Sequence, residues 1–330
     1  MKNPRRRLIA GLLFGFLVVV VLTLLSDVRQ VGGSLASFRW ALIPLILLCT
    51  LFNYAVRFLK WNFFLRLIGV RDLAWRESAR LFVAGFPLAL TPGKVGEALK
   101  AVWLNRMTGT PTARGVTVVL AERISDGLAV LALSALGVVA YPAYWPAFAT
   151  ILGLLLTGVI LSQIRPVALA LIRMAERLPL IGRIAHHLLE FYEGTYALFR
   201  PVSTLAAVGL GTLAWLGEGI GMYLVLLGLG AAPGWQTLSM AVFVLSFSIA
   251  VGAVSALPGG LGATEGSIAG MLTLLMALPA STAAAATLLI RFATLWFGVA
   301  LGLSVWSRSR DLLTLEAAVE PAAVQEDGAV

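Results

Sequence analysis

The sequence has 330 residues, of which 59% are hydrophobic and only 12% are charged, and its net charge is +9. Soluble domains usually carry about 25% charged residues, so this composition excludes an ordinary soluble domain and indicates a protein that has the bilayer as its solvent. The basic residues flank apolar runs, as they do at cytoplasmic membrane edges and anionic headgroups, which argues against a nucleic-acid partner.

The first predicted element is an uncleaved membrane span at residues 8–25, which follows three consecutive arginines at positions 5–7. A signal peptide would have a shorter apolar core and a small-residue cleavage site. Segments in lipid have to satisfy their own backbone hydrogen bonds, so the sequence predicts an all-α, polytopic transmembrane bundle. The other full-length apolar spans fall near residues 41–60, 116–140, 147–164, 202–229 and 282–306.

Two further pairs of apolar segments are each broken by a Pro-Gly turn. They are 80–91 with 95–107, and 237–257 with 265–278. The members of the first pair are too short to cross a core of about 30 Å separately. We interpret each pair as a re-entrant hairpin of two half-helices. The sidedness of the later spans is unchanged if one pair crosses fully, because a hairpin returns to its starting side.

Loop charges set the orientation by the positive-inside rule. The loops at 141–146 and 230–236 carry no cation and are placed outside, whereas the basic stretch 165–200 is placed in the cytoplasm as an amphipathic surface segment. We therefore expect a multi-pass protein of the inner (cytoplasmic) membrane with both termini in the cytoplasm. The cations that fix the cytoplasmic side are Arg5, Arg6, Arg7, Arg66, Arg71, Arg76, Arg80, Arg106, Arg114, Arg165, Arg173, Arg177, Arg183, Arg200, Arg308 and Arg310.

The predicted domain organisation is a single transmembrane domain, residues 1–310, followed by a disordered, acidic, Ala-rich cytoplasmic tail at 311–330. The single Cys49 excludes an internal disulfide and a thiolate metal site, and His186 with His187 makes a poor metal pair, so we expect no metal and no cofactor. Two Gly-x-x-x-Gly pairs permit close helix contacts, either in ordinary packing or in a homo-oligomer.

The chain contains an internal repeat. The first half reads Pro92-Gly-Lys-Val-Gly-Glu97 and the second reads Pro258-Gly-Gly-Leu-Gly-Ala-Thr-Glu265, and in each half an arginine follows the glutamate by 26 residues. A full span with a polar residue precedes each turn, so repeat one covers about 41–140 and repeat two about 202–306. The predicted sidedness makes this an inverted repeat, whose matching broken segments point to a transporter's binding site. The alternative is chance recurrence of Pro-Gly turns in a Gly-rich chain.

Charges inside apolar spans are costly and mark function. Arg123 and Arg291, the arginines of the repeat, lie deep in their spans, and the expected partners are Glu97, Glu265, Glu122 and Asp126. A structural salt bridge is one interpretation, and binding of an anionic headgroup is the other. Glu122 and Asp126 could alternatively serve as an enzyme's acid and base.

The turns offer further candidate ligands for a phosphate. Half-helices beginning near Lys94 and Gly260 would point free N–H groups at the membrane midplane, and Lys94 adds a cation. Glycines at these turns permit close approach of a headgroup, unless they serve turn geometry alone. We expect Arg57 and Lys60 to extend to the membrane edge, with headgroup binding as the alternative for Arg57, and Trp61 to be an interface anchor. The remaining candidate binding residues are Arg57, Gly96, Gly259 and Gly262, with Glu218 a weaker candidate.

These motifs resemble the flippase-like membrane domain of lysylphosphatidylglycerol synthases. The residues that carry the resemblance are Phe58-Leu-Lys-Trp61, Leu65, Gly69, Pro92–Glu97, Glu122-Arg123-x-x-Asp126, Pro258–Glu265 and Arg291, and it covers about residues 8–307. It implies lipid translocation or lipid-linked glycan assembly, with roles for Lys94, Gly96, Glu97, Glu122, Arg123, Asp126, Gly259, Gly262, Glu265 and Arg291. Because the sequence stops at residue 330, we expect no soluble aminoacyl-transfer domain and no synthesis of lysyl-lipid.

The hypothesis that follows is a lipid flippase or transporter whose partner is a membrane lipid with a phosphate headgroup. The second hypothesis is a membrane enzyme, and the third an accessory subunit, of lipid-linked glycan or hopanoid biosynthesis. The pattern shows no nucleophile motif, so we assign no catalytic residue.

Overall fold

The computed structural model describes residues 13, 15, 17–18, 27–91, 96–138, 145–163 and 185–309, and in this part of the chain every regular element is helical. The elements are α2 (Val28–Ser37), η1 (Trp40–Leu42), α3 (Ile43–Leu67), α4 (Trp75–Ala84), η2 (Phe86–Leu90), α5 (Leu99–Thr108), α6 (Thr112–Val138), α7 (Trp145–Gln163), α9 (Ala185–Leu198), α10 (Pro201–Gly228), α11 (Trp235–Val254), η6 (Pro258–Gly260), α12 (Ala263–Met276), α13 (Ala280–Arg291), the π-helix η7 (Phe292–Trp296) and α14 (Phe297–Arg308).

Long apolar helices make this a multi-pass membrane protein. Among the described residues, four helical segments are long and apolar enough to cross a bilayer: Trp40–Leu67, Pro201–Gly228, Trp235–Val254 and Ala280–Arg308. Large apolar side chains such as Leu48, Val202, Leu205 and Leu274 are exposed on the outside of the bundle, as expected of surfaces that face lipid. The prediction of an all-α membrane bundle is confirmed.

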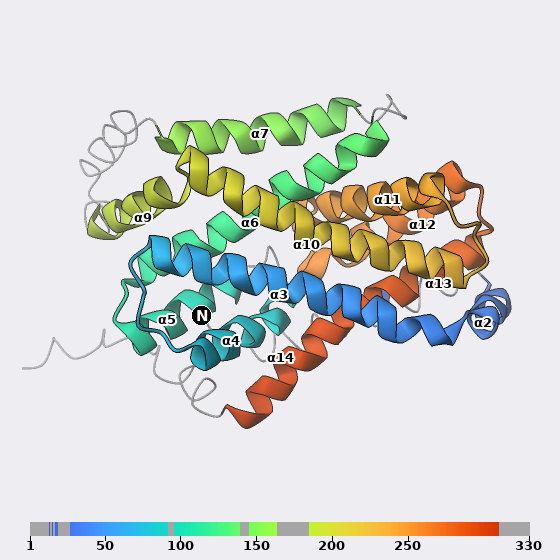
Figure 1. Ribbon diagram of the computed structural model, residues 1–330, viewed down its shortest axis with the longest axis horizontal. Helices are drawn as coiled ribbons and strands as arrows, with labels where there is room; N and C mark the ends of the chain where they lie inside the picture. The colour runs from blue at the N-terminus through green and yellow to red at the C-terminus, as the bar shows by residue number, and fades with distance from the viewer. Residues whose placement is uncertain are drawn as a thin grey trace, which may run out of the picture.

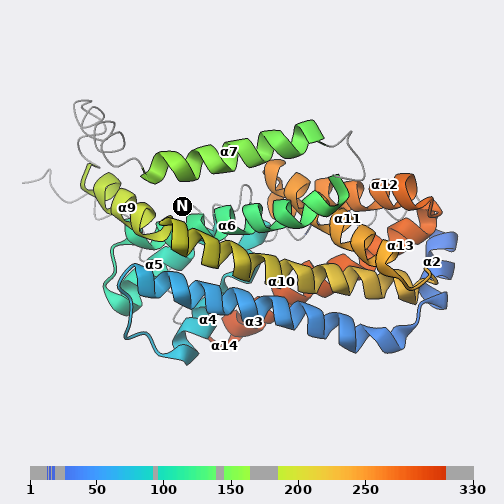
Figure 2. The ribbon, with the colours of Figure 1, turned by 45° about the horizontal axis from the view of Figure 1, so that its top comes forward.

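Helix α10 is central in the bundle. It packs against α3, α6 and α11, and Figures 1 and 2 show α3 and α10 side by side along the long axis. Glycines permit the close approach: a Cβ on Gly217 would lie 2.8 Å from the ring of Phe52 in α3, and one on Gly219 would lie 2.8 Å from Val242 in α11. Gly217 and Gly219 of α10 therefore serve contacts within the chain.

The two pairs of broken segments differ in length. α4 and α5 have 10 residues each, about 15 Å, which agrees with half-helices that do not cross the membrane separately. α11 has 20 residues, about 30 Å, and is long enough to cross on its own, whereas α12 has 14. The apolar run before Pro258 contains no proline, so α11 continues beyond the length of a half-helix. The re-entrant path and the inverted relationship of the halves stay predictions.

The last span contains a π-helical turn that the sequence pattern did not predict. α13, η7 and α14 form one continuous helical segment, and the π-turn at Phe292–Trp296 directly follows Arg291. The Tyr54 hydroxyl of α3 donates to the Thr294 carbonyl at 2.5 Å, across the turn. Such turns inside helices are frequent at functional sites.

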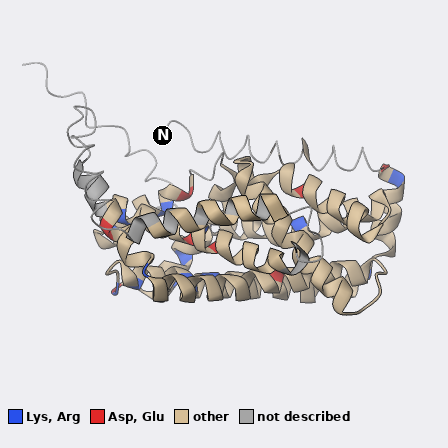
Figure 3. Ribbon diagram, turned by 90° about the horizontal axis from the view of Figure 1, so that it is seen from above, with Lys and Arg blue, Asp and Glu red and all other residues tan. Residues whose placement is uncertain are grey.

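The basic segments gather at one end of the bundle. Figure 1 shows the C-terminal end of α3, the start of α6 and the start of α10 at the same end, where Arg66, Arg114 and Arg200 lie. The uncharged turn between α10 and α11 lies at the opposite end. Figure 3 shows charged residues at both ends of the bundle and a few inside it. Arg39 donates to the Leu227 carbonyl near the C-terminal end of α10, so this end also carries a cation and the alternation of basic and uncharged loops holds only in part.

Several predictions concern segments outside the described residues. These are most of the first span at 8–25, the arginines at 5–7, Lys94, most of the loop at 141–146, residues 165–184, Arg310 and the tail at 311–330. The described end of the 165–200 stretch forms α9, which packs against α6 and α7. The division into one domain and a tail stays a prediction.

Candidate functional site

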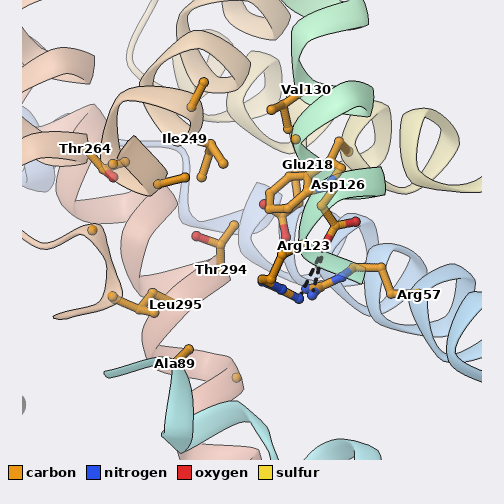
Figure 4. Close-up of a pocket in the computed structure, with 18 of the residues that line it drawn as sticks. Arg57, Ala89, Arg123, Asp126, Val130, Glu218, Ile249, Thr264, Thr294 and Leu295 are labelled. Carbon is orange, nitrogen blue, oxygen red and sulfur yellow. Dashed lines mark ion pairs between the residues drawn. The ribbon is translucent and has the colours of Figure 1, made fainter. Parts of the chain in front are cut away.

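A cavity of about 550 Å³ lies among the helices of both halves of the chain. Charged side chains contribute to its lining from α3, α5, α6, α10 and α13, and apolar side chains such as Val130, Leu131 and Ile249 form another part of the wall. Figure 4 shows Arg57, Arg123, Asp126 and Glu218 gathered at this cavity, together with Thr294 and Leu295. The volume is in the range of small-molecule sites.

Asp126 of α6 is the centre of an ion-pair cluster. Lys60 Nζ lies 2.5 Å from Oδ1, and the guanidinium groups of Arg57 and Arg123 lie 3.3 and 3.4 Å from Oδ2. Lys60 also donates to the Ser125 hydroxyl at 3.1 Å. Figure 4 shows dashed ion pairs converging on Asp126. One carboxylate thus holds three cations beside the cavity.

The interpretations of Lys60 and Trp61 from the sequence are wrong. Lys60 is fully buried in the protein, because Asp126 and Ser125 supply partners for its ammonium group and remove the need to reach the membrane edge. Trp61 is also fully buried, and its indole N–H donates to the Ser78 hydroxyl at 3.1 Å. Both residues stabilise the interior of the bundle.

Both glutamate–arginine pairs of the internal repeat form ion pairs. Arg123 Nε lies 3.4 Å from Glu97 Oε2, and Arg291 Nε donates to Glu265 Oε1 at 2.5 Å. Arg291 also donates through Nη2 to the Gly259 carbonyl at 3.0 Å. The shared spacing of 26 residues therefore corresponds to a shared contact. Both arginines line the cavity.

The turns differ from the expected phosphate cradle. The Gly96 N–H donates to Thr91 Oγ1 at 2.8 Å, and the Gly262 N–H donates to Glu265 Oε2 at 2.7 Å, so these two donors are already engaged. Gly259, Gly260 and Gly262 have φ values of 62°, 67° and 86°, which favour glycine, so turn geometry accounts for them.

The structure brings only part of the predicted set to the cavity wall. Glu122 and Glu265 do not line the cavity, and they pair with Lys100 and Arg291, which do. Lys94 lies outside the described residues. Of the described candidates, Arg57, Glu97, Arg123, Asp126, Gly259, Gly260 and Arg291 line the cavity, whereas Gly96, Glu122, Gly262 and Glu265 do not.

Two charged residues at the cavity were missed or undervalued. Lys100 of α5 is 4% exposed, pairs with Glu122 at 2.6 Å, and lies 4.6 Å from the centroid of the Trp61 ring. The feature of the sequence that could have identified Lys100 is its position inside the apolar run 95–107. Glu218 interrupts the apolar run of α10 and was only a weak candidate, yet it lines the cavity at 4% exposure.

The cavity also reaches the outer surface of the bundle. Leu154 of α7 and Val254 of α11 line it, and these side chains are 73% and 65% exposed. Helix α7 packs mainly against α6 and α9, and Figures 1 and 2 show it at the edge of the bundle. A ligand in the cavity could therefore contact both the charged interior and the apolar surface.

A second cavity, of about 250 Å³, is also lined by Arg291. Glu265, Thr287 and Trp296 are among its lining residues, and Arg291 lines both cavities. Arg291 therefore contacts both spaces, whereas its partner Glu265 lines only the second cavity.

Comparisons with known proteins agree with the architecture. Residues 8–302 match the family model described as the lysylphosphatidylglycerol synthase TM region. The chain is 27% identical over 317 residues to a UPF0104 membrane protein of Methanothermobacter thermautotrophicus, covering 88% of this chain and 91% of that protein. It is 24% identical over 130 residues to the glycosyltransferase AglD of Haloferax volcanii, covering 39% of this chain but only 21% of that protein.

Proposed function

The chain belongs to the family of the lysylphosphatidylglycerol synthase transmembrane region, and from this premise we propose that it is a lipid flippase or transporter. Its cargo is a phosphate-bearing membrane lipid, such as a phospholipid or a polyprenyl-phosphate-linked sugar. The observation that carries the proposal is a cavity of about 550 Å³ that combines interior arginines with an opening at the apolar surface.

The charges of the cavity suit a headgroup that carries an anion. Among the described residues, four cations line it (Arg57, Lys100, Arg123 and Arg291), against three carboxylates (Glu97, Asp126 and Glu218). A guanidinium group binds phosphate through two parallel hydrogen bonds, which are stronger than hydrogen bonds between neutral groups. A phosphate that displaced Glu97 from Arg123 would thus keep the arginine paired.

Alternating access would use the two copies of the repeat. In this proposal the halves rock against each other, and Arg123 and Arg291 exchange their glutamates for the headgroup in turn. The matched Glu97–Arg123 and Glu265–Arg291 pairs support this relationship. The half-helices would be re-entrant, both termini would lie in the cytoplasm, and the protein would function in the inner membrane, alone or as a homo-oligomer.

Reconstitution tests the proposal. Purified protein in liposomes that contain a trace of phosphatidylglycerol with a fluorescent headgroup should expose the inner-leaflet probe to an impermeant quencher. Arg123→Ala and Arg291→Ala should abolish this exposure while gel filtration shows intact folding. Arg80→Ala is the control, because Arg80 pairs with Glu77 at the surface and does not line the cavity. Wild-type rates in both cavity variants would exclude the proposed headgroup site.

A second candidate function is a membrane enzyme or accessory subunit in lipid-linked glycan or hopanoid biosynthesis. The observation that favours it is the partial similarity to a protein named as a glycosyltransferase. Incubating purified protein with a radiolabelled sugar donor and polyprenyl phosphate distinguishes the two. A labelled lipid product would support the enzyme, and its absence together with lipid exchange would support the transporter.

A further inference from the structure

A buried carboxylate without an ion pair faces the cavity from α10. Glu218 is 4% exposed, and within the described part of the chain its carboxylate has neither a hydrogen bond nor an ion pair. The other two carboxylates that line the cavity, Glu97 and Asp126, both have arginine partners. Charged side chains in a membrane interior are costly unless they are paired, so an unpaired one is a candidate for binding a ligand.

The local sequence holds Glu218 in place. Its neighbours Gly217 and Gly219 are the residues at which α10 approaches Phe52 of α3 and Val242 of α11. Larger side chains at these two positions would push the helices apart. The Gly-Glu-Gly sequence therefore fixes the glutamate between two close helix contacts, with its side chain at the cavity.

The charged surroundings of Glu218 come from three helices. α10 packs against α3, α6, α11, α13 and η1, of which α11 and η1 contain no ionisable side chain. Arg57, Arg291 and Asp126 line the same cavity as Glu218. The ionisable groups of the neighbouring helices on this side are Cys49, Tyr54, Arg57 and Lys60 of α3, Glu122, Arg123 and Asp126 of α6, and Arg291 of α13.

We propose that Glu218 is a proton-binding site that couples movement of the headgroup to a proton gradient. This inference rests on the proposed function and supplies its energy source. One proton from the water on one side of the membrane converts the carboxylate to the neutral acid, and the carboxylate forms again when that proton leaves to the other side. A metal ion is a poorer occupant, because the described residues offer no cluster of three ligating side chains.

Arg57 connects the proton site to the headgroup site. Its guanidinium carbon lies 5.7 Å from the centroid of the Trp215 ring, and Trp215 lies three residues before Glu218, on the same face of α10. Arg57 also contacts Asp126 at 3.3 Å. When Glu218 loses its proton, Arg57 is drawn from Asp126 toward α10, and Asp126 then holds Arg123 more firmly. Proton binding reverses this change and releases Arg123 for the headgroup.

Infrared spectroscopy tests proton binding independently of transport. The purified wild-type protein at neutral pH should show the carbonyl stretch of a protonated carboxylic acid, and this band should vanish in Glu218→Gln. Glu77→Gln is the matched control, because Glu77 is a surface carboxylate paired with Arg80. A spectrum in which Glu218→Gln removes no such band would overturn the proposal, whatever the transport assay shows.

Lipid exchange under a pH gradient tests the coupling. In liposomes with fluorescent phosphatidylglycerol, the gradient should change the wild-type rate severalfold, Glu218→Gln should lose this dependence, and Glu218→Asp should restore it. A wild-type rate that ignores the gradient, or an equal dependence in Glu218→Gln, would overturn the coupling and leave the flippase proposal standing. Absence of any lipid exchange would contradict the flippase and therefore the coupling, even with the infrared band present.

Discussion

Arg291 donates from Nε to Glu265 at 2.5 Å, and this pair is the counterpart of Arg123 with Glu97 in the first half of the chain. The second-half pair is the more buried, with side chains 7% and 6% exposed, whereas the Arg123 side chain is 27% exposed. Arg291 also lines both cavities. The two pairs thus share a spacing and a contact but differ in access, as expected if one arginine is open to a ligand and the other is closed.

Removing Glu265 should destabilise the protein. Glu265→Gln leaves Arg291 buried without its carboxylate, and breaking such a pair costs about 3–5 kcal/mol. The double variant Glu265→Gln/Arg291→Gln should lose less stability than the sum of the two single variants. Thermal unfolding in detergent measures this coupling, and additive losses would show that the pair contributes nothing as a pair.

Asp126→Asn should be more destabilising than Glu122→Gln. Asp126 holds Arg57, Lys60 and Arg123, whereas within the described residues Glu122 is paired with Lys100 alone. Removing one of the three cations should then relieve the excess charge, so Asp126→Asn/Lys60→Met should be more stable than Asp126→Asn. The unfolding midpoints of these variants provide the comparison, and a lower midpoint for the double variant would contradict the central role of Asp126.

Replacing Gly219 should separate α10 from α11. The Cβ of Gly219→Ala would lie 2.8 Å from Val242 Cγ2 and 3.2 Å from its Cα, and overpacking of this kind costs about 1–3 kcal/mol. Gly209→Ala is the control within the same helix, because no atom of another described element lies within 4 Å of its added Cβ, and the gain in helix propensity is up to about 1 kcal/mol. Equal stability of both variants would contradict the close packing.

A bulky residue at Leu154 should slow lipid exchange. Leu154 lines the cavity and is exposed on α7, whereas Leu156 on the same helix is exposed but does not line the cavity. Leu154→Trp should obstruct the opening to the apolar surface and reduce the exchange of fluorescent phosphatidylglycerol in liposomes. Leu156→Trp should keep the wild-type rate, and an equal loss in both variants would show that the effect is not specific to the opening.

The sequence predicted the membrane class and the glutamate–arginine contacts because each depends on a local pattern. Long apolar runs dictate helices in lipid, and an equal spacing in two repeats pointed to Glu97–Arg123 and Glu265–Arg291 before any distance was known. The burial of Lys60 was not predictable from a local pattern. Whether a cation near a helix end reaches the membrane edge or turns inward depends on a partner, here Asp126, that lies 66 residues further along the chain.

The turns show a second limit of sequence reasoning. The Pro-Gly pattern identified the places where helices break, but the N–H groups of Gly96 and Gly262 are engaged by Thr91 and Glu265. A side-chain acceptor three or five residues away can satisfy such a donor as well as a ligand can. Lys100 and the π-turn after Arg291 depend on packing between distant helices, which no local pattern records.

The most direct test of the central claim is the amount of lipid that the purified protein retains. Native mass spectrometry of the wild-type protein in detergent should show a bound phosphate-bearing lipid, and Arg123→Ala/Arg291→Ala should lose it while Arg80→Ala retains it. Equal occupancy in all three proteins would contradict headgroup binding by the paired arginines.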